Sequence, residues 1–126
     1  MSRSLRILVV DDEVGFARSM ARSLRRLGHE PTLALHPVDA LALFREQSFD
    51  AVITDIDMPE MSGIELARSL RQQRGDVPIA FCTGSDPANG RLEEAATLGP
   101  VKGKSAREAD VRAILLALTA MFVAAT

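Results

Sequence analysis

Short apolar runs alternate with segments of helical periodicity along this chain, and that alternation limits the folds open to it. The apolar runs cover residues 5–10, 31–36, 51–54 and 77–82, with a very short one around residue 101. Helical patterns over residues 16–27, 37–47, 64–73, 87–98 and 106–126 follow them in turn. Five such units predict an α/β fold, a parallel sheet with right-handed crossovers and helices on both faces.

Length and composition fit one globular domain. The chain has 126 residues, of which 47% are apolar and 25% charged, and its net charge is -2. The arginines form no long basic run, so we expect no direct nucleic-acid partner. The apolar run Ile7–Val10 is too short for a signal peptide, and the uncharged run Ala113–Thr126 is too short for a membrane span. We expect a single domain over residues 1–126 without an effector domain, in the cytoplasm, where Cys82 is buried and reduced.

Polar residues follow the predicted strands at the ends where parallel sheets bind ligands. These residues are Asp11, Asp12, Asp55, Asp57, Thr83 and either Lys102 or Lys104. Two carboxylates about 4 Å apart repel by on the order of 4 kcal/mol at an effective dielectric of 20, so the cluster needs a cation. Oxygen ligands without His or Cys favour a hard ion such as Mg²⁺. With a lysine and a hydroxyl opposite the ion, this edge predicts a cradle for a phosphoryl group, in which an aspartate is the nucleophile.

Three stretches of the sequence resemble the receiver domain of two-component response regulators. They are Val9–Glu13 (VVDDE), Asp55–Gly63 (DIDMPEMSG) and Phe81–Gly84 (FCTG). The resemblance implies a flavodoxin-like fold, in which five parallel strands take the order 2-1-3-4-5. It also implies a signalling domain that promotes only its own phosphorylation and dephosphorylation, and not an enzyme with other substrates.

The same resemblance implies a phosphoacceptor and a metal site. Asp55 would accept the phosphoryl group and also bind Mg²⁺ or Mn²⁺. Asp12 would bind the ion directly, Asp11 largely through water, and Asp57 through its backbone carbonyl. Cofactor and acceptor would therefore share one cluster of carboxylates.

The resemblance further implies how the phosphoryl group is held and where it comes from. Thr83 would hydrogen-bond one phosphoryl oxygen, and a lysine would pair with another. We prefer Lys104 to Lys102 because it lies later on the predicted strand. The donor would be a phosphohistidine on a histidine kinase or a phosphotransfer protein. Its helices would dock near the first helix, where Phe16 and Arg18 are candidate contacts.

The C-terminal third departs from the family pattern. Ser105 follows the lysine where the family usually has proline, and Val101 stands at a position that is usually aromatic. Without proline we expect no cis peptide bond here, because it would cost about 2.5–4 kcal/mol. Without the aromatic residue, the usual coupling of Thr83 to an aromatic side chain cannot operate. A receiver that acts mainly as a docking or dimerisation module is therefore the alternative hypothesis.

The last predicted helix supports that alternative, since it carries a second apolar stripe. The stripe consists of Leu116, Ala120 and Val123. A helix that is apolar on two sides is expected to be covered on two sides. We therefore predict contact with a second copy of the chain or with a neighbouring domain.

Two other interpretations fail on residue spacing. Asp55-Ile56-Asp57 has the Asp-x-Asp pattern of aspartate-nucleophile phosphatases, but Pro59 stands where those enzymes have Thr or Val. The stretch 103–105 (GKS) ends like a nucleotide-binding phosphate loop, which would require glycine at Leu98. Neither an aspartate-nucleophile phosphatase nor a nucleotide-binding loop is expected.

Overall fold

The computed structural model describes residues 3–84 and 91–125. The strands in these ranges are β1 (Arg6–Val10), β2 (Glu30–Ala34), β3 (Ala51–Thr54), β4 (Ile79–Thr83) and β5 (Val101–Gly103). The helices are α1 (Val14–Arg26), α2 (Pro37–Glu46), α3 (Gly63–Gln73), α4 (Arg91–Ala96) and α5 (Glu108–Ala125). Every strand pairing is parallel, and the order β2-β1-β3-β4-β5 confirms the predicted flavodoxin-like fold.

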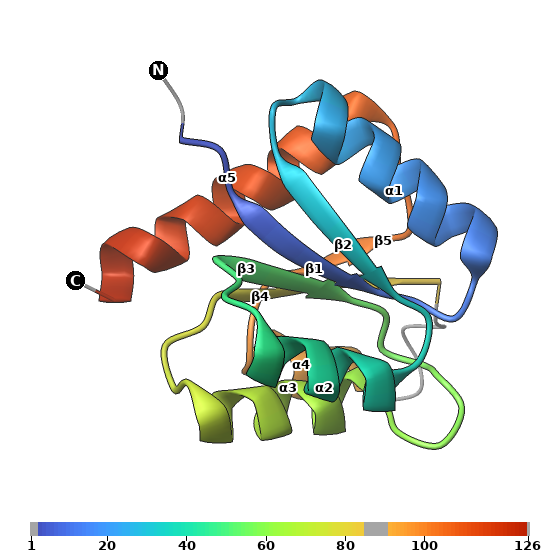
Figure 1. Ribbon diagram of the computed structural model, residues 1–126, viewed down its shortest axis with the longest axis vertical. Helices are drawn as coiled ribbons and strands as arrows, with labels where there is room; N and C mark the ends of the chain where they lie inside the picture. Colours follow the sequence, from blue (N-terminus) through green and yellow to red (C-terminus); the bar gives the residue numbers. More distant parts are fainter. Residues whose placement is uncertain (1–2, 85–90, 126) are drawn as a thin grey trace.

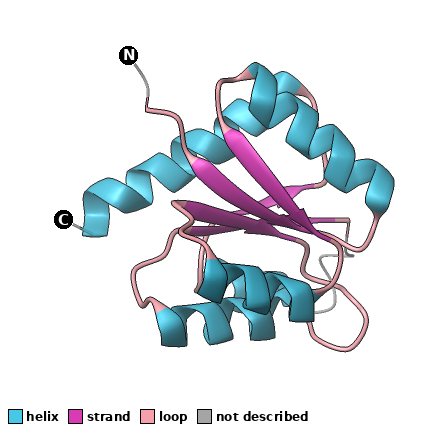
Figure 2. Ribbon diagram, in the orientation of Figure 1, coloured by secondary structure: helices cyan, strands magenta, loops and turns pink. Residues whose placement is uncertain are grey.

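Helices cover both faces of the sheet, with α1 and α5 on one face and α2, α3 and α4 on the other (Figure 1). Figure 2 shows the same three layers by type of secondary structure. In the central strand β1, Ile7 and Val9 face α1 and α5, whereas Leu8 and Val10 face the opposite core. Burial of each such side chain contributes about 1.5–3 kcal/mol to the stability of the fold, and this packing holds the ends of the strands in position.

Some element boundaries differ from those predicted. Strand β4 begins at Ile79 and not at Val77, because Pro78 has no N–H to donate to the sheet ladder. Helix α5 begins at Glu108 and not at Ala106. The predicted helix over residues 87–98 is described as α4 (Arg91–Ala96), and residues 85–90 lie outside the described part of the chain.

Helix α5 buries one of its two predicted apolar stripes. The buried residues are Val111, Ile114, Leu115 and Leu118. The side chain of Leu116 is 72% exposed, and Ala120 is exposed as well. Contact of the second stripe with another copy or domain therefore stays a prediction. Among the described helices, none is both long enough and apolar enough to cross a membrane.

The first residue of α3 lies against the end of β3. The N–H of Gly63 donates to the carbonyl of Ile56 over 2.7 Å. A Cβ atom at Gly63 would overlap the backbone carbonyl oxygen of Asp55. A capping box between Ser62 and Glu65 fixes the helix start at this point. Only glycine therefore allows α3 to approach Asp55 so closely.

We predict that Gly63→Ala lowers the free energy of unfolding by about 2 kcal/mol or more, since the backbone atoms in its way cannot move cheaply. The matched control is Gly15→Ala in the first turn of α1, where a Cβ meets no atom within 4 Å. That change should be neutral or stabilise by up to about 1 kcal/mol. Urea unfolding followed by far-UV circular dichroism measures both, and a wild-type midpoint for Gly63→Ala would contradict the prediction.

Candidate functional site

Two aspartates meet because the strands that precede them are neighbours. Val10 at the end of β1 is in register with Thr54 at the end of β3. Asp11 and Asp55 follow directly, so both carboxylates leave the same edge of the sheet. One oxygen each of Asp11, Asp12 and Asp55 lies within 4.8 Å of the others. We call these three residues the acidic cluster, and the structure thus brings together the three carboxylates predicted from strand ends.

The acidic cluster is buried at its centre. Asp11 is 1% exposed and Asp55 is 5% exposed, whereas Asp12 is more exposed. Oδ1 of Asp11 accepts a hydrogen bond from the N–H of Glu13 over 2.9 Å, and Oδ1 of Asp55 accepts one from the N–H of Ile56 over 2.8 Å. Oδ2 of Asp11 is buried and accepts no hydrogen bond from the described residues, although Nζ of Lys104 lies 3.0 Å away as an ion-pair partner. Three carboxylates this close together, with oxygen ligands only, fit a hard divalent cation.

Lys104 supplies the positive charge next to the acidic cluster. Its Nζ lies 3.0 Å from Oδ2 of Asp11 and 3.3 Å from Oδ2 of Asp55. It also lies 2.6 Å from Oε1 of Glu13. One ammonium thus faces three carboxylates, and the negative charge that remains can attract a further cation.

The other candidate lysine lies apart from this group. Lys102 is exposed, whereas the Lys104 side chain is 17% exposed. Residues 101–103 form β5, so the Gly-Lys-Ser stretch is a strand end and not a phosphate-binding loop. The N–H of Lys104 donates to the carbonyl of Thr83 over 3.0 Å, which ties the lysine to the end of β4.

Burial and neighbouring charges together shift the pKa values of the site residues. Burial raises the pKa of Asp55 to about 6, with the charge of Asp11 adding to the rise and Lys104 opposing it. Burial also raises the pKa of Asp11. Burial alone would lower the pKa of Lys104, but the carboxylates of Glu13, Asp11 and Asp55 outweigh it and the pKa stands above its usual value. Below the cluster, burial and then Asp11 and Asp55 raise the pKa of the Cys82 thiol to about 12.

Thr83 and Asp57 lie at the same edge of the sheet. Thr83 ends β4, the neighbour of β3, and is 7% exposed. Asp57 follows β3 in the loop that leads to α3, and its carboxylate is half exposed. This carboxylate pairs with Arg91 of α4 over 3.0 Å.

Sequence reasoning missed three partners of the site residues. Glu13 makes the shortest contact to Lys104, and Nζ of Lys104 lies 5.2 Å from the centre of the Phe16 ring. Arg91 pairs with Asp57. The one available signal in the sequence was Glu13, the third acid in the run Asp11–Glu13, which stands directly before α1.

We predict that Asp55→Asn stabilises the metal-free protein by about 1–3 kcal/mol at pH 8. A raised carboxyl pKa means that the ionised form of Asp55 costs stability above about pH 6, and this cost fades as the pH falls through 6 toward 4. The gain should therefore shrink at pH 4.5. Urea unfolding by circular dichroism in EDTA measures it, with the exposed Asp57→Asn expected to change stability by less than about 1 kcal/mol. Equal gains at both pH values would contradict this explanation.

Known proteins match most of this chain in sequence. Residues 7–101 match the response regulator receiver domain. Response regulator MprA of Mycobacterium sp. (strain KMS) is 40% identical over 88 residues, which are 70% of this chain and 38% of that protein. MprA of Mycobacterium tuberculosis (strain ATCC 25177 / H37Ra) is 38% identical over 89 residues, 71% of this chain and 39% of that protein. The chain thus spans less than half the length of these relatives.

Solved structures give the same result. Response regulator protein TrrA of Thermotoga maritima, solved in complex with Mg(2+)-BeF, superposes with a TM-score of 0.80 and 30% identity over 90% of this chain and 98% of that one. A receiver domain protein of Clostridium thermocellum superposes with a TM-score of 0.78 and 27% identity, over 94% and 98% of the two chains. The chain belongs to the family of response regulator receiver domains of two-component signalling.

Proposed function

We propose that this receiver domain is a phosphoacceptor and that Asp55 takes a phosphoryl group from a phosphohistidine of a histidine kinase or phosphotransfer protein. The observation that carries the proposal is the position of the Asp55 carboxylate, which is buried between a second carboxylate and an ammonium at the sheet edge. A carboxylate that is already held in position can act as a nucleophile without first being oriented.

In the proposed transfer, a carboxylate oxygen of Asp55 forms a bond to phosphorus while the bond from phosphorus to the histidine nitrogen breaks. The leaving imidazole takes up a proton. Lys104 would move from its carboxylate partners to a phosphoryl oxygen, and the hydroxyl of Thr83 would donate to another. The Lys104 ammonium and the Thr83 residue already lie at the edge of the sheet that carries Asp55. Nζ of Lys104 lies 3.3 Å from Oδ2 of Asp55, and Thr83 ends the neighbouring strand β4.

The residues present fit a Mg²⁺ or Mn²⁺ ion. Asp11, Asp12 and Asp55 supply oxygen ligands only, and among the described residues the buried Oδ2 of Asp11 has an ion-pair contact to Lys104 but accepts no hydrogen bond. The backbone carbonyl of Asp57 is the further ligand that we propose. When bound, the ion supplies positive charge to the carboxylates and to the phosphoryl oxygens. TrrA of Thermotoga maritima, a relative in fold and sequence, was solved with Mg(2+)-BeF.

The domain would act as a signalling element, without turnover of an external substrate. We place it in the cytoplasm, where a buried and reduced Cys82 is stable. A docking module with little switching is the second candidate. Two observations favour it. Val101, which pairs with Phe81 in the sheet, stands where the family usually has the aromatic residue that couples to Thr83. The exposed Leu116 offers an apolar contact on α5.

Treatment of the protein with acetyl phosphate and Mg²⁺ should add the mass of one phosphoryl group, as seen by intact mass spectrometry. Asp55→Asn should add none, and EDTA should prevent the reaction in the wild type. Asp57→Asn is the matched control, because it removes a nearby carboxylate that is half exposed and keeps the acceptor. No mass gain in the wild type, or an equal gain in Asp55→Asn, would refute the phosphoacceptor proposal.

Lys104→Gln should slow this phosphorylation about 10-fold to 100-fold, since a charge-assisted contact is worth about 1.5–3 kcal/mol and each 1.4 kcal/mol is about tenfold in rate. Lys102→Gln removes the same charge from an exposed side chain on β5, two residues earlier in the chain, and should react at the wild-type rate. The time course of mass gain compares them. Equal rates for the two variants would remove Lys104 from the proposed mechanism.

A further inference from the structure

A pocket of about 750 Å³ lies at the amino edge of the sheet, opposite the edge that carries the acidic cluster. Three of its lining residues, Leu5, His29 and Pro78, directly precede β1, β2 and β4. Helix α5, whose C-terminal half extends past the amino ends of the strands in Figure 1, forms a further wall. We call this feature the amino-edge pocket.

The amino-edge pocket has the size and the apolar lining of a small-molecule site. Such sites commonly have a volume of about 300–1,000 Å³ and are mainly apolar, with a few polar groups that fix the orientation of the ligand. Leu5 and Leu115 are buried, Leu27 and Phe122 are partly buried, and all four belong to the same hydrophobic core. The apolar part of a ligand placed here would extend that core.

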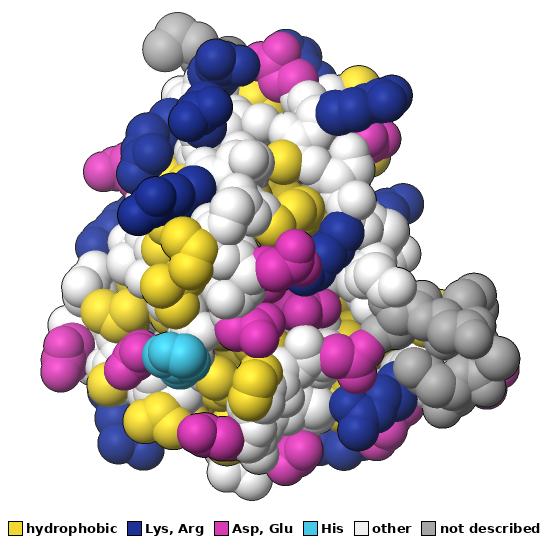
Figure 3. Space-filling model, turned by 90° about the vertical axis from the view of Figure 1, so that its right-hand side faces the viewer, with side chains coloured by type: hydrophobic (Ala, Val, Ile, Leu, Met, Phe, Trp, Pro, Cys, Tyr) yellow, Lys and Arg dark blue, Asp and Glu magenta, His cyan; other side chains and the backbone are white. Residues whose placement is uncertain are grey.

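The ionisable groups in the lining give the pocket a positive charge. They are Arg3, Arg74, Arg112, His29 and Asp76. Because three guanidinium groups stand against one carboxylate, an anionic group is attracted to this end of the sheet. The carboxyl edge differs, since acidic side chains gather near the centre of the face that Figure 3 shows. The two ends of the sheet therefore attract ions of opposite sign.

Arg112 is the cation of the pocket that the domain leaves unpaired. It is exposed, and among the described residues no ion pair or hydrogen bond involves its guanidinium group. Arg3 and Arg74, in contrast, pair with Asp50 and Asp76 over 2.7 and 3.4 Å. The N–H groups of Arg112 are thus available to an anionic ligand.

His29 adds a second donor. Its Nδ1 accepts a hydrogen bond from the N–H of Leu5 over 3.0 Å, and burial lowers the pKa of the imidazole. The ring is therefore neutral at neutral pH and carries its proton on Nε2, which can only donate. Within the described part of the chain, Nε2 has no hydrogen-bond partner. A carboxylate has two oxygens and can accept from both a guanidinium group and an imidazole N–H.

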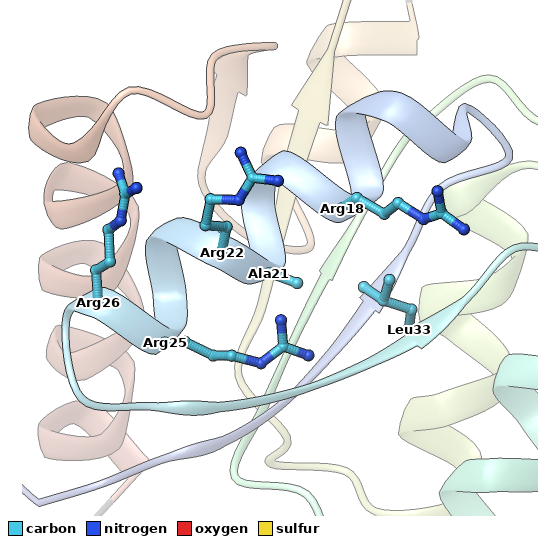
Figure 4. Close-up of a pocket in the computed structure, with 6 residues that line it drawn as sticks. All are labelled: Arg18, Ala21, Arg22, Arg25, Arg26 and Leu33. Carbon is cyan, nitrogen blue, oxygen red and sulfur yellow. The ribbon is translucent and has the colours of Figure 1, made fainter.

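A second basic groove shows why charge alone does not define this site. That groove lies on α1 and is shown in Figure 4. Arginines dominate its lining, in which Ala21 and Leu33 are the apolar side chains. It thus resembles the amino-edge pocket in charge but has a smaller apolar lining, so it provides a matched position for a control variant.

We propose that the amino-edge pocket binds an organic anion of the fatty-acid class, with a carboxylate head and an unbranched chain of about ten carbons. The head would accept hydrogen bonds from Arg112 and from Nε2 of His29, which the domain does not use itself. The chain would lie against Leu27, Leu115 and Leu116, where its burial removes apolar surface from water.

Binding at this pocket does not rest on phosphorylation of Asp55. Leu5 and Asp11 lie before and after β1, about 20 Å apart along the extended strand, and no lining residue belongs to the acidic cluster. The test therefore uses the full chain without phosphodonor or metal. The probe is decanoate, kept well below the concentration at which it forms micelles, and isothermal titration calorimetry measures its affinity.

We expect saturable binding of decanoate at one site, and binding of octanoate that is weaker by on the order of tenfold, because two fewer methylene groups are buried. Arg112→Gln should weaken decanoate binding about threefold to tenfold. Arg22→Gln, in the groove of Figure 4, removes the same charge and should bind as the wild type does.

A steric variant tests the position of the ligand without a change of charge. Thr119 is exposed on α5 and lines the pocket, so Thr119→Trp places a large ring in it. Decanoate affinity should fall by about tenfold or more, since the chain loses its apolar contacts. Circular dichroism checks that this variant and the arginine variants fold.

Four results would overturn the proposal. The first is no saturable binding of decanoate, or equal binding of decylammonium, which would mean detergent-like association. The second is an equal loss in Arg22→Gln and Arg112→Gln, which would mean that only net charge matters. The third is wild-type affinity in Thr119→Trp, which would place the anion elsewhere. The fourth is a dimer in sedimentation that decanoate does not dissociate and Thr119→Trp does, which would assign the pocket to a second copy of the chain.

Discussion

Two buried carboxylates, those of Asp11 and Asp55, share one ammonium, and the rest of the domain keeps these three groups together. Pairing of β1 with β3 sets the two acids side by side, and apolar cores on both faces prevent the strands from sliding apart. Gly63 lets α3 pack directly against the end of β3. The three-residue strand β5 brings Lys104 to the same edge. Without the ammonium, mutual repulsion of the acids would favour opening of the sheet at its functional end.

The fold could be predicted in large part because its signals are local. Short β-branched runs and helical spacing indicate the number and order of elements along the chain, and Gly28, with φ of 91°, lies two residues past the end of α1. The strand order could not be derived from such signals, because many orders satisfy the same pattern of elements. It came from the family resemblance. The observed start of β4 differs from the predicted one because a single residue, Pro78, has no N–H to donate to the sheet.

The site could be predicted as far as backbone position decides it. Thr83 ends a strand and Asp11, Asp12, Asp55 and Lys104 follow strand ends, and parallel strands bring those ends to one edge. What sequence could not provide is how far each side chain reaches. The partners of Lys104 and Asp57 depend on helix positions over the sheet edge, and nothing in a linear pattern fixes those distances.

The position of Cys82 beneath the carboxylates has a consequence for studies of this protein in solution. Thiol reagents react with the thiolate, and a pKa of about 12 leaves almost no thiolate at neutral pH. The side chain is also 1% exposed, and it is the one cysteine in the sequence. The native chain therefore behaves toward maleimides as if it had no cysteine. A cysteine introduced on the surface would be labelled alone, and slow labelling of Cys82 would report transient separation of the sheet from α1 and α5.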